Sequence, residues 1–139
     1  GVENEWIELE ITESAAMAHP EGAVEVLQRL RERGIQIAMD DFGTGHSSLA
    51  MLRTLPLHVP KLARSFVQHL PESETAAAVA GAVVTLARRL GLSVVAEGVE
   101  TEAQQHFLAG IGCDLLQGYL FSRPLPAAEF EAWLSKRYG

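Results

Sequence analysis

Five short apolar stretches divide this chain at regular intervals. Each either alternates apolar with polar residues or is rich in β-branched and aromatic residues, which is typical of strands. The third is the weakest of them, because Pro60 cannot donate a ladder hydrogen bond. The predicted strands are Trp6–Thr12, Ile35–Met39, His58–Ala63, Leu92–Ala96 and Leu115–Phe121.

The segments after these strands carry helical patterns. The clearest is Glu74–Leu90, where apolar residues recur every three or four positions before Gly91 ends the helix. The other four predicted helices are one with Pro20 in its first turn that ends at Gly34, a short one from Ser47 and Ser48 to Leu52, one capped by Thr101 and Gln104 that ends near Ile111, and one that Pro126 opens. In the last helix we expect Phe130, Trp133 and Leu134 to face inward.

Strands that alternate with helices predict an α/β protein with a parallel sheet. The five βα units recur at the interval seen in βα barrels, so we expect part of a TIM-type barrel. With 139 residues, the chain fits one domain with its own hydrophobic core.

Charge and cysteine content narrow the possible partners. The net charge is −7 and no basic patch is visible, which argues against binding to a nucleic-acid polymer or a membrane surface. Cys113 is the only cysteine, so no internal disulfide can form, and a reducing compartment is expected. The longest apolar run, residues 76–87, is too short to cross a bilayer.

Two adjacent carboxylates follow the second predicted strand. Asp40 and Asp41 stand where the strand ends, and Gly43 and Gly45 allow the backbone to bend there. Because adjacent residues of a strand face opposite ways, such a bend is needed to bring both side chains to one site. Paired carboxylates suit Mg2+ or Mn2+, but an Asp-rich strand exit can equally cap the next helix.

Further polar residues occupy equivalent places along the chain. Glu10, Lys61, Glu97 and Gln117 lie, like Asp40 and Asp41, at or near the C-terminal ends of predicted strands. Each alone is explained by an ion pair or a cap, but in a βα barrel this end of the strands carries the active site. Four carboxylates beside one lysine would repel one another without cations, which favours a divalent metal site and is compatible with a two-metal site for phosphate-ester hydrolysis.

The joint pattern resembles the EAL domain family. The segments that carry the resemblance are Glu10–Ser14, Asp40–Gly45, Lys61, Ala96–Glu100 and Gln117–Tyr119, in the family's order and spacing. The resemblance implies a bacterial, cytoplasmic cyclic di-GMP phosphodiesterase domain with a (βα)8 barrel. Residues 1–139 would be its C-terminal part and supply the fourth to eighth barrel strands.

The resemblance also implies roles for single residues. Glu10 and Asp40 would bind a first Mg2+ or Mn2+ ion, and Asp41 a second. Lys61 would hold the attacking water or the phosphate oxygens, and Glu97 would act as general base or assist a metal-bound water. By the same resemblance, Gln117 lines the metal and phosphate pocket, while Glu13 braces the loop 42–48. The other loop-supporting residues would be Thr44, Gly45 and Glu100.

The chain departs from the family pattern in two respects. The family's signature Glu-Ala-Leu and a metal-binding Asn belong to earlier strands that this chain does not contain. The family motif Asp-x-Leu-Lys-Ile-Asp reads His58 to Ala63 here, so its second Asp is replaced by Ala63, and His46 stands where Tyr is common.

These departures leave three functional hypotheses. The first is the C-terminal part of a cyclic di-GMP phosphodiesterase that is inactive alone. The second is a degenerate EAL module that binds the nucleotide or a protein partner without turnover. The third, a different βα barrel with carboxylate metal ligands, is disfavoured by the joint motifs. Open barrel edges also predict a homo-oligomer, or pairing with the missing N-terminal barrel segment.

Overall fold

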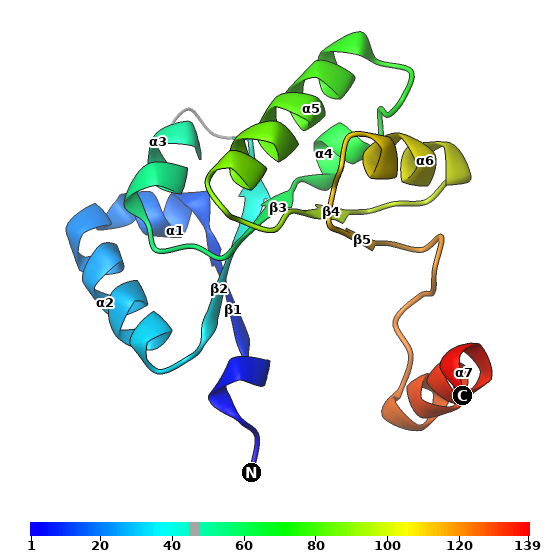
Figure 1. Cartoon of the computed structure of the whole chain (residues 1–139), viewed down its shortest axis with the longest axis horizontal. Helices are drawn as coiled ribbons and strands as arrows, with labels where there is room; N and C mark the ends of the chain where they lie inside the picture. Colours follow the sequence, from blue (N-terminus) through cyan, green and yellow to red (C-terminus); the bar gives the residue numbers. More distant parts are fainter. Residues whose placement is uncertain (45–47) are drawn as a thin grey trace.

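The computed structural model describes residues 1–44 and 48–139, whose strands form one parallel sheet. The sheet order β1-β2-β3-β4-β5 follows the chain, so each βα unit lies beside the next (Figure 1). This confirms the predicted α/β architecture of five parallel strands. The strands are β1 (Glu8–Thr12), β2 (Gln36–Phe42), β3 (Val59–Leu62), β4 (Val95–Glu97) and β5 (Leu115–Gln117).

The described residues form seven α-helices rather than the predicted five. Helices α1 and α2 are separate because proline disfavours helical geometry in the residue before it, and His19 is accordingly non-helical between them. The helices are α1 (Glu13–Ala18), α2 (Pro20–Glu32), α3 (Ser48–Thr54), α4 (Arg64–Val67), α5 (Glu74–Arg89), α6 (Glu102–Gly110) and α7 (Ala127–Tyr138). Ser47, which was expected to start α3, lies outside the described residues.

Every predicted strand differs from the structure at one end or both; the largest error at a strand start is in β4, which begins at Val95 and not at the predicted Leu92. Trp6 belongs to the 3-10 turn η1 (Asn4–Trp6), so β1 starts two residues later. Strand β2 continues past Met39 to Phe42. Strand β5 ends at Gln117 because the chain turns at Gly118, where a Cβ atom would lie 2.0 Å from the carbonyl oxygen of Val99.

The main hydrophobic core lies on one face of the sheet. Ile37, Met39, Phe42 and Leu62 are fully buried there, together with apolar residues of helices α1, α2, α3 and α5. On the other face, strand alternation places a second, small cluster of Ala38, Val59 and Val95. The core is therefore built mostly on the helix-covered face.

Helix α7 stands apart from the other helices, at the end of an extended segment (Figure 1). It contains no buried residue, and Phe130 and Leu134 are exposed. The expectation that Phe130 and Leu134 face inward was therefore wrong, whereas Trp133 is half-buried; a helical stripe of apolar residues does not specify what covers it. Within the described part of the chain, no helix has the length and hydrophobicity needed to cross a bilayer.

Candidate active site

The polar residues predicted for the site lie on one face of the sheet. Residues two apart on a strand share a face, and the register pairs Glu10 with Ala38, and Glu97 with Gln117. Lys61 is two residues after Val59, which belongs to the small cluster of that face. Sequence alternation and parallel pairing thus bring these side chains together near the C-terminal ends of the strands.

Lys61 is the centre of this group. Its side chain is almost fully buried, and its Nζ forms ion pairs with the Oε1 atoms of Glu10 and Glu97, the latter at 2.6 Å. Burial works against the charged form, but the two carboxylates outweigh it, so the pKa of Lys61 is raised. Lys61 is therefore a fixed positive charge that ties β3 to β1 and β4.

Glu97 behaves differently from a simple ion-pair partner. Burial raises its pKa above the ordinary value, Lys61 pulls it down, and the neighbouring carboxylate of Asp40 raises it again. Because a lysine partner alone would lower this pKa, the net rise shows that burial and Asp40 prevail. Glu97 therefore holds a proton more readily than an exposed glutamate.

Asp40 and Asp41 sit at an irregular point of the sheet. Met39 pairs with Pro60 and Phe42 pairs with Leu62, so β2 has one residue more than β3 in this interval. This is a β-bulge, a feature that redirects side chains. Pro60, which lacks a ladder donor, lies at its start.

The backbone bends sharply at Asp41. Its φ is +53°, in the left-handed region, and its N–H donates to Oδ1 of Asp40 at 2.8 Å. Thr44 Oγ1 donates to the Asp41 carbonyl at 2.8 Å, and its loop-supporting role stays a prediction. Gly43 also has a positive φ, with Phe66 packed against it. The predicted bend is present, whereas Gly45 and His46 lie outside the described residues.

Glu13 and Glu100, two predicted supporting residues, differ in their surroundings. Glu13 starts α1 and is only 7% exposed, although its support of the loop 42–48 stays a prediction. Glu100 is more exposed and forms an ion pair with Arg64 at 2.7 Å, while its backbone N–H donates to the side chain of Gln104. Arg64 also packs over Gly98, directly after Glu97.

Arg64 and Gln104 were not predicted to support the site, although Gln104 was predicted to cap a helix. Arg64 lies two residues beyond the end of β3, and the buried Gln104 belongs to the capping box that was recognised only as a helix start. The signal that was available for Arg64 was its position shortly after the end of β3, and for Gln104 its place in the capping box that follows Glu100.

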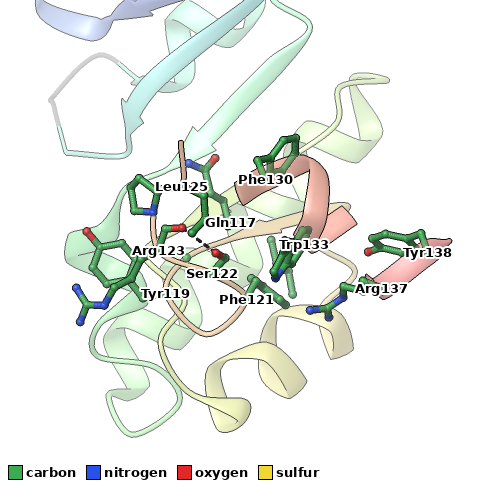
Figure 2. A pocket seen from close by; sticks show the side chains of 13 residues that line it. Gln117, Tyr119, Phe121, Ser122, Arg123, Leu125, Phe130, Trp133, Arg137 and Tyr138 are labelled. Carbon is green, nitrogen blue, oxygen red and sulfur yellow. Dashed lines mark hydrogen bonds between the residues drawn. The ribbon is translucent and has the colours of Figure 1, made fainter. Parts of the chain in front are cut away.

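Gln117 lies at the edge of the sheet and borders two hollows. The smaller, of about 240 Å³, is also lined by Glu97, Arg64 and Glu100. The larger, of about 670 Å³, lies between the segment after β5 and helix α7, where Phe121 and Trp133 are drawn close together (Figure 2). Of the two, only the smaller hollow includes an acidic residue of the Lys61 group.

The predicted metal ligands suit a hard cation in type. Glu10, Asp40 and Asp41 offer carboxylate oxygens, and the pKa of Glu97 is raised first by burial and then by the negative charge of Asp40, which a cation would offset. Within residues 1–44 and 48–139, however, no group of three or more Asp, Glu, His and Cys side chains comes close enough to hold a metal ion. The metal assignment therefore stays a prediction.

Comparison with known proteins identifies this arrangement. A sequence model described as the EAL domain matches residues 1–124. The chain belongs to the EAL domain family. Its likeness to solved EAL domains also supports the prediction of a partial TIM-type barrel. The match ends before α7, so the part of the chain that resembles an EAL domain contains the whole sheet and all the predicted site residues.

Curated and solved relatives agree with this assignment. The cyclic di-GMP phosphodiesterase NbdA of Pseudomonas aeruginosa is 50% identical over 93% of this chain, which covers 16% of that protein. The structure of the MucR phosphodiesterase of the same species, a c-di-GMP complex, has 46% identity and a TM-score of 0.87 over 93% of this chain and 52% of that chain. A manganese and cyclic di-GMP complex of Klebsiella pneumoniae BlrP1 has 36% identity and a TM-score of 0.84 over 89% of this chain and 32% of that one.

Two departures from the family pattern have structural consequences in this EAL domain. Ala63 is buried and precedes α4, whose N-terminus has no side-chain cap. His58 accepts a hydrogen bond at its Nδ1 from the backbone N–H of Ile37 at 3.0 Å. His58 thus replaces an aspartate with another hydrogen-bond acceptor, whereas the side chain of Ala63 has no polar atom.

Proposed function

We propose that residues 1–139 are the C-terminal part of the EAL domain of a metal-dependent cyclic di-GMP phosphodiesterase. The observation that carries this proposal is the placement of Lys61 between Glu10 and Glu97, beside Asp40, at the C-terminal end of a parallel sheet. Relatives that share nearly half of its residues carry the phosphodiesterase name, which supports the same reaction here.

Basic, acidic and neutral residues of this chain would have different roles in the reaction. Lys61 places a buried positive charge where phosphate oxygens would lie, and its bonds to Glu10 and Glu97 fix its position. Glu97, with its raised pKa, suits the acceptance of a proton from an attacking water. Gln117, opposite Glu97 in the register, would hold the substrate through its amide.

A divalent cation completes this proposal. Glu10, Asp40 and Asp41 would hold Mg2+ or Mn2+, which when bound neutralises the phosphodiester and makes water a better nucleophile. We expect weak binding, because the ligands expected from other barrel strands are not in this chain. In titration calorimetry with Mn2+, Asp40→Ala should abolish binding, and an unchanged isotherm would contradict the assignment.

We further infer that this chain alone does not hydrolyse cyclic di-GMP at a useful rate. A methyl group at Ala63 stands where the family has a carboxylate, and small displacements of catalytic groups can cost about 100-fold in rate. Incubation with cyclic di-GMP and Mg2+ or Mn2+, followed by chromatography, should show no linear dinucleotide. Robust turnover that Glu97→Ala abolishes would refute the inactivity while supporting the catalytic role.

A second candidate function is nucleotide or partner binding without catalysis. The buried, uncapped Ala63 favours it, because its loss of a carboxylate affects turnover more than ground-state binding. Calorimetry with cyclic di-GMP separates the two candidates once the upstream barrel strands are added. Binding without turnover, unchanged by Ala63→Asp, would favour the binding module, whereas turnover gained by Ala63→Asp would favour the enzyme.

We also propose that the open sheet edges are covered in the working protein. Strands β1 and β5 are the two edges, and Leu9 and Leu115 are exposed on them. Unpaired strand edges associate readily with other chains. A second copy or the N-terminal barrel segment would cover them, and light scattering that shows a stable monomer at micromolar concentration would count against this proposal.

A further inference from the structure

A further polar cavity, distinct from the two hollows beside Gln117, lies near the N-terminal ends of β2 and β3, whereas Lys61 lies near the C-terminal end of β3. It has a volume of about 470 Å³ and is formed by the end of α2, helix α3, the start of β3 and the segment after α5. We call it the basic cavity, because Arg31, Arg53 and His58 line it together with Leu52, Leu55 and Ser93. Among the described residues that line it, none is acidic, in a chain whose net charge is −7.

The two arginines of the basic cavity have no carboxylate partner within residues 1–44 and 48–139. The ion pairs in the described part of the chain are formed by other basic residues, namely Arg29, Lys61 and Arg64. Arginine in the last turn of a helix interacts favourably with the helix dipole, which explains each of them singly. The helix dipole does not explain why Arg31 and Arg53 line the same cavity as His58.

His58 is held rigidly and presents a donor. Its N–H donates to Ile37 O at 2.9 Å, its carbonyl accepts from Ser93 N at 3.2 Å, and its Nδ1 accepts from Ile37 N. Because Nδ1 is an acceptor, the proton of the neutral ring is on Nε2. Burial and, after it, the positive charge of Arg31 lower the pKa of His58, in keeping with the place of both residues in the lining of one cavity. The cavity therefore combines two guanidinium groups with a fixed N–H donor.

We propose that the basic cavity binds a small phosphorylated anion. Guanidinium groups bind phosphate through paired hydrogen bonds, and about 470 Å³ lies within the size range of small-ligand pockets. Leu52 and Leu55 give one part of the wall an apolar surface, which suits the base of a mononucleotide. His58 directly precedes β3 and lies three residues before Lys61, about 10 Å of extended chain, so this site is separate from the phosphodiesterase site.

The test is a titration of the 139-residue chain with pyrophosphate, followed by NMR of the His58 imidazole. Saturable shifts of the His58 signals are expected, and Arg31→Ala and Arg53→Ala should each weaken binding on the order of 10-fold. Both arginines are exposed, so their replacement leaves the core intact. Arg29→Ala is the matched control, because it removes the same charge from the same helix outside the cavity.

Adenosine monophosphate and sulfate complete the comparison. Tighter binding of the nucleotide than of pyrophosphate would support a nucleotide ligand, and the reverse would support free phosphates. The proposal is overturned if the His58 signals do not move at millimolar pyrophosphate, if sulfate binds equally well, or if Arg29→Ala weakens binding as much as Arg31→Ala. None of these outcomes depends on phosphodiesterase activity.

Discussion

The two faces of the sheet differ in what covers them and in what they carry. The helix-covered face is packed with fully buried residues such as Ile37, Met39 and Leu62. The opposite face has only the small cluster of Ala38, Val59 and Val95, and then the charged group around Lys61. Because side chains alternate along a strand, the same five strands place the residues of the main core on one face and the charged residues of the candidate site on the other.

This difference explains why a buried charge is tolerated on the open face. Lys61 is as buried as the core residues, but both its carboxylate partners are partly exposed. Water therefore still reaches Glu10 and Glu97, which lowers the cost of holding charge there. On the covered face, the described strand residues at the centre of the sheet, such as Ile37, Met39 and Leu62, are apolar and fully buried.

The largest effect is expected on the covered face. Phe42→Ala removes a fully buried aromatic ring from the main core, and should lower the free energy of unfolding by about 3–5 kcal/mol. Urea denaturation of the two proteins measures this difference. A loss below about 1 kcal/mol would mean that the covered face is not the main source of stability.

A smaller effect is expected from the charged group of the open face. Lys61→Met keeps the volume but leaves the partly buried Glu97 beside Asp40 without its cation, at a cost of about 2 kcal/mol in unfolding free energy. Glu10→Gln is the control and should cost less, because Glu10 is nearly half exposed. If Lys61→Met stabilises the protein, the cost of burying the charge exceeds the gain from pairing.

Acidification should produce a still smaller loss through His58. Its pKa is lowered from 6.5 by burial and then by Arg31, so below that pH the unfolded state binds the proton more readily than the folded state. His58 therefore stabilises the fold above pH 6.5, and this contribution is lost as pH falls through the lowered pKa. Protonation also removes the Nδ1 acceptor of the Ile37 N–H.

Urea denaturation at a series of pH values isolates this contribution. His58→Asn retains a side-chain oxygen that can accept from Ile37 but cannot titrate. The difference in unfolding free energy between the wild type and His58→Asn should shrink or reverse below pH 6.5. A difference that does not change with pH would exclude His58 as the group responsible.

The smallest effect is expected at the exposed edge. Leu115 is 58% exposed, so Leu115→Ser should change the unfolding free energy of this chain by no more than about 0.5 kcal/mol. The same urea experiment measures it. A loss of 2 kcal/mol or more would show that the edge is already covered in solution, for example by a second copy.

Much of the site followed from sequence because it depends on local regularities. A period of two and parallel pairing are enough to place Glu10, Lys61, Glu97 and Gln117 on one face. The bulge at Asp40 and Asp41 was not predicted, although the bend was, because a bulge is a relation between two strands. It depends on how β3, with Pro60, pairs with β2.

Features that depend on distant partners were beyond the sequence. The apolar stripe of α7 was visible, but nothing local specifies whether another element covers Phe130. The basic cavity is formed by four separate segments, so no local sequence motif predicts it. By contrast, the break between α1 and α2 could have been predicted, since Pro20 restricts the residue before it.

Because α7 is exposed, its helical content should depend on whether another element or chain packs against it. An isolated helix of about 12 residues is only marginally stable in water, and α7 buries none of its side chains. Its helical content should therefore rise when anything packs against it and fall when that contact is removed. Trp133, stacked with Phe130 at a centroid distance of 6.1 Å, gives a fluorescent signal at this position. In a Trp6→Phe variant, where Trp133 is the only tryptophan, the fluorescence spectrum would thus follow the assembly of the whole domain without an added label.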